Sequence, residues 1–215
     1  MFGLLSTSDP SALLSGLRRL PLLAVLRPNS LEQARLQLSQ LQQAGLSHVE
    51  LAVQLTPEWR QMAAGLVQEF PGLQLGAASV RCSAGLAAAC EAGLGYAVSP
   101  ILDPELLEQA AAASITLVPG VFSPTEIAAA VRWGAPAVKL YPAAVLGANY
   151  WRSLAGPLHP LPFCIAAGGL AVADAEPWLA AGVNALALGS SLFAGDALDP
   201  ALSSLVVKLR SKCYP

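Results

Sequence analysis

Charged residues are scarce in this sequence, and long uninterrupted apolar runs are missing although apolar residues are abundant. Only 12% of the 215 residues are Asp, Glu, Lys or Arg, against 54% hydrophobic residues, and the formal net charge is -2. No run of Lys or Arg provides the basic surface that nucleic-acid binding requires. Prolines, glycines and polar residues interrupt every candidate before roughly 18 apolar residues accumulate, so we expect no membrane-spanning helix. We therefore expect a small-molecule partner, and neither nucleic acid nor a membrane.

The four cysteines and two histidines of the chain are too scattered to indicate a metal site. They include no CxxC pair, and each histidine stands alone. These six residues are Cys82, Cys90, Cys164, Cys213, His48 and His159. We expect no bound metal, and cysteines that are reduced and serve as small apolar fillers.

The beginning of the chain lacks the layout of a secretory signal. Arg18 and Arg19 follow a mildly apolar stretch, whereas a signal peptide carries its basic residues in front and a cleavage site behind. We expect a cytoplasmic protein whose residues 1–20 form a short helical leader.

A diluted internal repeat runs along the chain, in which a helical pattern ends in glycine and a short apolar segment follows. Its copies are QAGLSHVEL, EAGLGYAV, RWGAPAVKL and AAGVNALAL, with glycines at Gly45, Gly93, Gly134 and Gly182. Glycine suits this position because a helix that ends there needs a left-handed residue. The intervals of 48, 41 and 48 residues each have room for two strands and two helices.

Helix starts point to the same organisation. Thr56-Pro57, Asp103-Pro104 and Ser123-Pro124 each place a capping residue before a proline suited to the first helical turn. Apolar runs between these signals predict eight strands, at 22–26, 48–53, 73–79, 95–99, 115–118, 137–141, 163–167 and 184–188. Eight alternating βα units without a linker favour an α/β fold of the closed (β/α)8 TIM-barrel type, as a single domain over residues 1–215, over an open doubly wound sheet.

Two charged residues lie in the interiors of predicted strands, where exposure to water does not explain them. Lys139 lies between Val138 and Leu140, and strand alternation places it on the face opposite those two. Glu50 occupies the corresponding place in the second strand. Because alternate strands of such a barrel contribute side chains to shared interior layers, the two residues can meet inside it.

A buried lysine and a buried carboxylate together suffice for imine chemistry. Burial disfavours the charged form of lysine, and the neutral amine is the nucleophile that attacks a ketone. A neighbouring carboxylate can move the protons that imine formation and carbon-carbon cleavage require. From the residues alone, a structural ion pair between Lys139 and Glu50 is an equally good interpretation.

Six segments in order resemble the keto-deoxy-phosphogluconate and keto-hydroxyglutarate aldolase family. They are AVLRPNS at 24–30, VELAVQLTP at 49–57, LGAASV at 75–80, VPGVFSPTE at 118–126, VKLYPA at 138–143 and AAGGL at 166–170. The resemblance covers about residues 20–195. It implies a homotrimeric barrel without metal or cofactor. It also implies Schiff-base cleavage of 2-keto-3-deoxy-6-phosphogluconate to pyruvate and glyceraldehyde 3-phosphate.

The same resemblance implies roles for individual residues. Lys139 matches the lysine that forms the Schiff base, and Glu50 matches the general acid/base. Arg27 is a plausible partner for the pyruvate carboxylate, because a guanidinium can hold two carboxylate oxygens at once. Ser79 lies where the family usually has a threonine, whose hydroxyl would bind the same carboxylate.

The loops after the last two strands are candidates for phosphate binding. Gly168 and Gly169 allow close approach of a ligand, and Gly189-Ser190 precedes a predicted helix whose amides could hold an anion. The remaining pocket candidates, which an ordinary packing role would also explain, are Pro100, Phe122 and Tyr141.

Three departures from the family pattern concern the substrate. Gln54 stands where several phosphogluconate-specific members have arginine, Ala78-Ser79 replaces Gly-Thr, and Ala167 replaces a threonine. We include Gln54 and Ser79 among the substrate-binding candidates. Alternative substrates are the galactonate epimer, whose enzymes tolerate an uncharged residue in place of that arginine, and 4-hydroxy-2-oxoglutarate. A phosphate-binding barrel without catalysis and a phosphosugar isomerase are the alternatives outside this chemistry.

Overall fold

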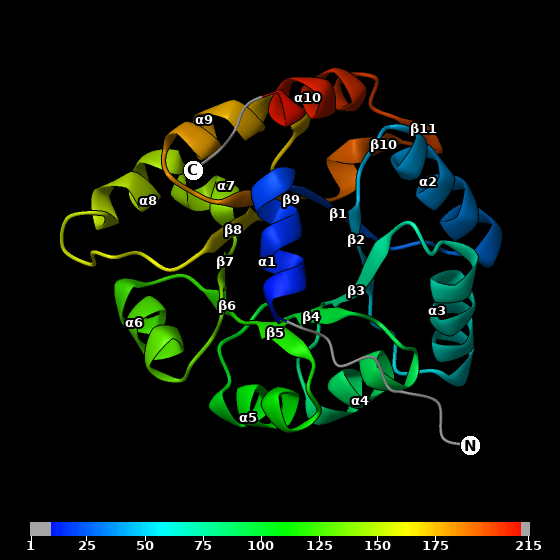
Figure 1. Cartoon of the computed structure of the whole chain (residues 1–215), viewed down its shortest axis with the longest axis horizontal. Coiled ribbons are helices and arrows are strands. Elements are labelled where there is room, and N and C mark those ends of the chain that lie inside the picture. The colour runs from blue at the N-terminus through cyan, green and yellow to red at the C-terminus, as the bar shows by residue number, and fades with distance from the viewer. Residues whose placement is uncertain (1–9, 212–215) are drawn as a thin grey trace.

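The computed structural model describes residues 10–211, in which strands and helices alternate around a central barrel (Figure 1). The main sheet contains β1 (Leu22–Leu26), β2 (His48–Ala52), β3 (Gln74–Ala78), β4 (Tyr96–Val98), β5 (Thr116–Val118), β6 (Gly120–Val121), β7 (Val138–Leu140), β8 (Cys164–Ala167) and β9 (Ala185–Leu188). The helices are α1 (Pro10–Arg19), α2 (Leu31–Gln43), α3 (Pro57–Glu69), α4 (Ser83–Glu91), α5 (Pro104–Ala112), α6 (Pro124–Arg132), α7 (Ala143–Leu146), α8 (Ala148–Leu154), α9 (Ala175–Ala180) and α10 (Ala201–Arg210). Two single-turn 3-10 helices, Val172–Asp174 and Ser190–Leu192, and a short antiparallel pair, β10 (Phe193–Ala194) and β11 (Ala197–Leu198), complete it.

The nine strands of the main sheet are parallel and follow the order β5-β4-β3-β2-β1-β9-β8-β7-β6. Only Pro119 separates β5 from β6, so these two are parts of one extended segment. Its first part pairs with β4 and its second part pairs with β7. The barrel closes through this segment, which confirms the (β/α)8 prediction.

The interrupted strand is the main difference from the predicted elements. The sequence predicts a strand that ends at 118, whereas the extended backbone resumes at Gly120. Proline has no N–H to give to a ladder, and Pro119 instead accepts a hydrogen bond of 2.8 Å from the backbone of Lys139 through its carbonyl. The break therefore reflects one missing donor and not the end of the strand.

The predicted helix signals are confirmed. The side chains of Thr56, Asp103 and Ser123 each accept a hydrogen bond from a backbone N–H in the first turn of the following helix. The four glycines of the repeat have positive φ angles between 71° and 95°. The capping residues and the glycines thus determine where the helices of the βα units begin and end.

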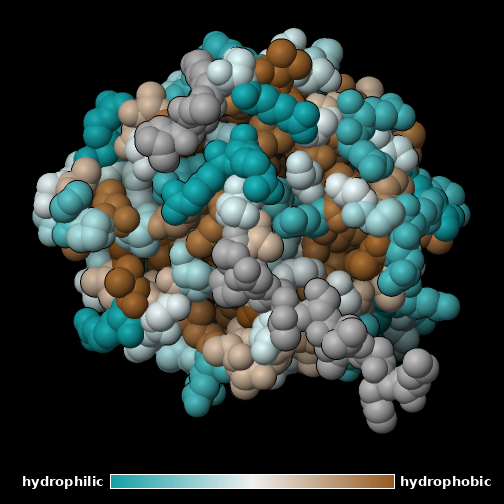
Figure 2. All heavy atoms as spheres, viewed as in Figure 1, coloured by the Kyte–Doolittle hydropathy of each residue, from teal (hydrophilic) through white to brown (hydrophobic). Residues whose placement is uncertain are grey.

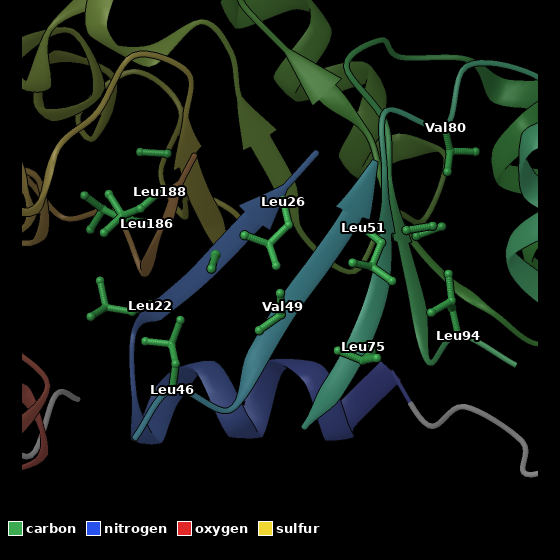
Figure 3. Packing of buried hydrophobic residues seen from close by; sticks show 14 of the residues in the cluster. Leu22, Leu26, Leu46, Val49, Leu51, Leu75, Val80, Leu94, Leu186 and Leu188 are labelled. Atoms are coloured by element: carbon green, nitrogen blue, oxygen red, sulfur yellow. The ribbon is translucent and has the colours of Figure 1, made fainter. Parts of the chain in front are cut away.

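Each barrel strand has one face in a large outer core and one face in a smaller inner core. Alternate residues such as Leu26, Leu51 and Leu75 belong to the outer core, and Figure 3 shows them on β1 to β3. The intervening positions point into the barrel, where Leu23 and Ile165 are buried. A residue on the inner face is thereby removed from water even if it is charged.

Helix α1 lies across the amino ends of the strands and closes that mouth of the barrel (Figures 1 and 3). Its Leu13 and Leu17 belong to the inner core. Its Gly16 packs against the buried His48, since a β-carbon there would lie 2.3 Å from the imidazole ring. Of the leader predicted over residues 1–20, residues 10–19 form α1, and residues 1–9 lie outside the described residues.

The cysteine prediction is right for Cys164 and wrong for Cys82 and Cys90. All three are free thiols, but only Cys164 is buried. Cys82 directly before α4 and Cys90 in its last turn are exposed and so fill no core position. Cys213 lies outside the described residues.

The outer surface is mixed in polarity. On the face in Figure 2, hydrophilic side chains dominate the rim, and apolar side chains show mainly in hollows between them. No helix within residues 10–211 is long and apolar enough to cross a membrane.

Candidate active site

A cavity of about 470 Å³ opens at the carboxyl ends of the strands, opposite the mouth that α1 closes. It is lined by Val25, Arg27, Lys139, Tyr141, Ala167, Gly168, Gly169, Leu170, Ala187, Gly189, Ser190 and Ser191. These residues come from β1, β7, β8 and β9 and from the loops that follow those strands. Seven of the predicted site residues, far apart in the sequence, are thus brought together.

Lys139 lies in the middle of β7 and points into this cavity. Its neighbours Val138 and Leu140 are fully buried in the outer core, so alternation turns the lysine inward. The side chain is only 8% exposed, and Nζ lies 4.7 Å from the centre of the Tyr141 ring. Burial lowers the pKa of Lys139, the negative charge of Glu50 opposes that change, and the positive charge of Arg27 adds to it.

Glu50 lies on β2 and is buried inside the barrel, beside Val25 of β1 and Gly76 of β3 in the strand register. Neither carboxylate oxygen has a hydrogen-bond partner among residues 10–211. Burial raises the pKa of Glu50 to about 7, although the positive charges of Lys139 and Arg27 act in the opposite direction. Near neutral pH this carboxyl group can therefore both take up and release a proton.

Arg27 directly follows β1 and lines the same cavity with an exposed side chain. No carboxylate within residues 10–211 lies within 4.0 Å of its guanidinium. A free guanidinium at the edge of a cavity is suited to bind a carboxylate or phosphate group of a ligand.

The loops after β8 and β9 form the other wall of the cavity. Gly168 has a φ of 97°, and a β-carbon there would lie 2.9 Å from the Tyr141 ring, so only glycine fits. Ser191 donates a hydrogen bond of 2.6 Å to the carbonyl of Leu170 and so ties the two loops together. Our sequence interpretation missed Ser191, although its place beside Gly189-Ser190 was the available signal.

Five predicted site residues do not line this cavity: Glu50, which is buried inside the barrel, and four others. Gln54 lines a separate cavity of about 550 Å³ between α2 and α3. Ser79 follows β3 with a φ of 62°, which is rare for a residue other than glycine. Pro100 packs against Gly120, where a β-carbon would lie 2.3 Å from the Pro100 backbone. Phe122, at 46% exposure, accepts a hydrogen bond of 2.7 Å from the hydroxyl of Tyr150 through its carbonyl.

A closed (β/α)8 barrel whose carboxyl-end cavity holds a lysine that is largely buried has the architecture of a barrel enzyme. Comparison with known proteins identifies which kind. Residues 13–205 match the family model described as KDPG and KHG aldolase. The chain belongs to this family, and we conclude that it is an aldolase and thus a lyase.

Individual relatives agree on the family but differ in substrate. The probable 2-dehydro-3-deoxy-6-phosphogalactonate aldolase of Rhizobium meliloti is 30% identical over 190 residues, which are 86% of this chain and 90% of that protein. The 2-dehydro-3-deoxy-phosphogluconate aldolase of Dickeya dadantii is 32% identical over 181 residues, 83% and 84% of the two chains.

A solved structure of a similar protein shows the same fold. The KDPG aldolase of Legionella pneumophila, with pyruvate captured as a covalent carbinolamine intermediate, superimposes with a TM-score of 0.78. Its sequence is 25% identical, and the match covers 94% of this chain and 96% of that one.

Proposed function

We propose that this protein is a class I aldolase that forms a Schiff base on Lys139 and cleaves a phosphorylated 2-keto-3-deoxy sugar acid. The observation that carries the proposal is the buried Lys139 in the carboxyl-end cavity, with the buried Glu50 inside the barrel close enough to affect its pKa. Burial lowers the pKa of Lys139 and raises the pKa of Glu50, so it favours the neutral form of each residue. Imine formation needs a neutral amine and a carboxyl group that can donate a proton. The covalent carbinolamine of the Legionella relative supports the same chemistry.

The reaction can be written with these residues. The neutral Nζ of Lys139 attacks the C2 ketone of the substrate, and Glu50 donates the proton with which the carbinolamine loses water. The resulting iminium accepts the electrons of the C3–C4 bond when a base, which we assign to the Glu50 carboxylate, removes the C4 hydroxyl proton. Glyceraldehyde 3-phosphate leaves, the enamine is protonated at C3, and water releases pyruvate from Lys139.

The two ends of the substrate find complementary groups. Arg27 is free to bind the carboxylate next to the ketone, close enough to Lys139 to affect its pKa. The backbone of Gly168, Gly169, Gly189 and Ser190 forms the opposite wall, where we place the phosphate. The left-handed Ser79 at the end of β3 is consistent with a role in the site, since strained residues gather at functional sites. We keep Tyr141, which lines the cavity, as a residue that shapes the pocket.

The direct test is cleavage of synthetic 2-keto-3-deoxy-6-phosphogluconate, followed by the appearance of pyruvate. We expect the wild type to release pyruvate and Lys139→Arg, which keeps the charge but cannot form the imine, to release none above background. Lys208→Arg is the matched control, because Lys208 forms an exposed ion pair with Glu176 and does not line the cavity. Full activity in Lys139→Arg would refute the proposal.

The galactonate epimer is a second candidate substrate, favoured by the match to the Rhizobium meliloti relative over 90% of that protein. The resemblance at Gln54 points the same way, because enzymes for the galactonate epimer tolerate an uncharged residue at this position. Measuring kcat/KM for both epimers under identical conditions distinguishes them. If neither epimer is cleaved, 4-hydroxy-2-oxoglutarate is the next substrate to assay. A chain that binds phosphate without cleaving any of the three would be a barrel that has lost catalysis.

We also propose that the protein is a cytoplasmic homotrimer, which rests on resemblance to the family alone. Light scattering coupled to size exclusion would then give a mass three times that of the 22.1 kDa chain. A monomer mass at working concentration would contradict this part of the proposal.

A further inference from the structure

Several buried polar atoms inside the barrel have no protein partner. Within residues 10–211, neither carboxylate oxygen of Glu50, nor the hydroxyl of Tyr96, nor the hydroxyl of Thr116 makes a hydrogen bond to another residue. All three side chains are at least 96% buried. Because a buried polar group without a partner is costly, such groups are normally paired with one another or bridged by water.

Tyr96 of β4 lies beside Glu50 because the strand between them carries a glycine. A β-carbon on Gly76 of β3 would lie 2.4 Å from Cζ of Tyr96, the ring atom that carries the hydroxyl. Gly76 is also the register neighbour of Glu50, and neighbouring strands are about 4.8 Å apart. The phenol ring therefore occupies the space next to the stem of Glu50.

The hydroxyl of Tyr96 keeps its proton in this place. Burial and the negative charge of Glu50 both raise the pKa of Tyr96 well above 10. A neutral phenol beside a carboxylate is a hydrogen-bond donor, and a donor to the charged form of a carboxylate favours that form.

Other charged and titratable groups lie on β2 itself and on other strands of the barrel. Lys139 of β7 and Arg27 after β1 both act on it with positive charge. His48 lies two residues earlier on β2, and burial lowers its pKa to about 4, so it is neutral at the pH values at which Glu50 titrates. Tyr96 is the neutral donor whose own pKa the charge of Glu50 affects.

We propose that Tyr96 is a positioning residue for Glu50, whose carboxylate it holds toward Lys139 by donating its hydroxyl hydrogen bond through one bridging water. This inference rests on the proposed function, because it assigns Glu50 the proton transfers of the imine mechanism. The bridging water satisfies both buried groups and fixes the orientation of the carboxylate. In this arrangement Tyr96 does not touch the substrate and acts only through Glu50.

Thr116 supplies a matched control. It is the register neighbour of Tyr96 on β5, the strand on the side of β4 away from Gly76. The Tyr96 ring lies over Gly76 and so reaches away from Thr116. Thr116→Val therefore removes a buried hydroxyl from the same layer of the barrel without removing the donor to Glu50.

The proposal can be tested by measuring, with proton NMR and as a function of pH, the rate at which the C3 hydrogens of pyruvate exchange with deuterium from the solvent. Exchange needs only the imine on Lys139 and a base to remove the C3 proton, so it is independent of which sugar acid is the substrate. In the wild type the rate at saturating pyruvate should rise as Glu50 loses its proton. Tyr96→Phe keeps the ring over Gly76 but removes the donor.

We expect Tyr96→Phe to move the rise of the exchange rate to higher pH by about one pH unit, because the carboxylate loses a charge-assisted hydrogen bond. The KM for pyruvate should stay within about twofold, and Thr116→Val should match the wild type. A Tyr96→Phe profile that overlies that of the wild type, or moves to lower pH, would overturn the proposal. If the wild type neither exchanges nor forms a borohydride-stable adduct with pyruvate, the imine mechanism itself fails. Adduct formation without any effect of Tyr96→Phe removes only the role of Tyr96.

Discussion

The two mouths of the barrel are built on opposite principles. At the amino ends of the strands, α1 inserts Leu13 and Leu17 into the inner core, and burial lowers the pKa of His48 to about 4, which keeps it neutral. At the carboxyl ends, a cavity of about 470 Å³ remains open and holds Arg27 and the buried Lys139. The first mouth is packed for stability, whereas the second retains charges that burial makes costly. The residues that we assign to catalysis and the residues that pack for stability thus lie at opposite ends of the barrel.

The largest expected effect comes from Glu50→Gln, which should damage the open mouth without unfolding the chain. The amide keeps the shape of Glu50 but cannot move protons, so we expect kcat for cleavage to fall by roughly 10²- to 10⁴-fold. Glu58→Gln, an exposed change on α3, should leave kcat unchanged. Steady-state kinetics on folded protein measures both. A loss of less than tenfold in Glu50→Gln would rule out its role as the proton carrier.

The same variant should increase stability, which sharpens the contrast between the mouths. Folding raises the pKa of Glu50 from 4.5 to about 7, so the folded wild type holds a proton that the unfolded chain releases. The contribution of the Glu50 carboxyl group to the free energy of unfolding is therefore fully present below pH 4.5 and is lost as the pH rises through 7. Glu50→Gln has no group that ionises at this position, so its stability does not fall in this way. We expect the free energy of unfolding of Glu50→Gln, minus that of the wild type, to be about 3 kcal/mol larger at pH 8 than at pH 4.5. Urea unfolding at the two pH values tests this, and a constant difference would contradict it.

Arg27→Gln should weaken substrate binding at the open mouth. Hydrogen bonds to a charged group contribute about 1.5 to 3 kcal/mol, so we expect KM for pyruvate in the deuterium exchange assay to rise roughly 10- to 100-fold. Arg35→Gln is the control, because Arg35 forms an exposed pair with Glu69 and lines the other cavity. Equal KM values for the two variants would remove Arg27 from the carboxylate site.

Gly16→Ala should damage the packed mouth and leave the chemistry intact. The added β-carbon would lie 2.3 Å from the His48 ring, so α1 must move, at an expected cost of about 1 to 3 kcal/mol. Gly65→Ala in α3 meets nothing within 4 Å and should be neutral or stabilising by up to about 1 kcal/mol. Thermal unfolding compares the two variants, with kcat measured well below the transition. Equal melting temperatures would show that α1 does not depend on this contact.

Much of this architecture could be predicted from the sequence because its signals are local. Capping residues such as Thr56, followed by proline, and glycines such as Gly45 mark helix ends by backbone geometry alone. The inward direction of Lys139 follows from strand alternation. The continuation of β5 beyond Pro119 could not be predicted, because the partner of its second part is β7, a strand that is distant in the sequence.

The details of the site were harder to predict for the same physical reason. Which residues line a cavity depends on how loops after different strands pack together, and no local pattern encodes this. Gln54 therefore proved to line a different cavity, and Ser191, which no motif singled out, proved to join the two glycine loops. The space that Gly76 leaves for Tyr96 is likewise visible only when β2, β3 and β4 lie side by side.

The central claim is that Lys139 forms an imine with pyruvate, and intact-protein mass spectrometry after incubation with pyruvate and borohydride tests it most directly. The chain has only three lysines, at positions 139, 208 and 212, so the adduct can be assigned with few variants. We predict one pyruvate-sized adduct in the wild type and in Lys208→Ala, and none in Lys139→Ala. An adduct that persists in folded Lys139→Ala, or its absence from the folded wild type, would contradict the account.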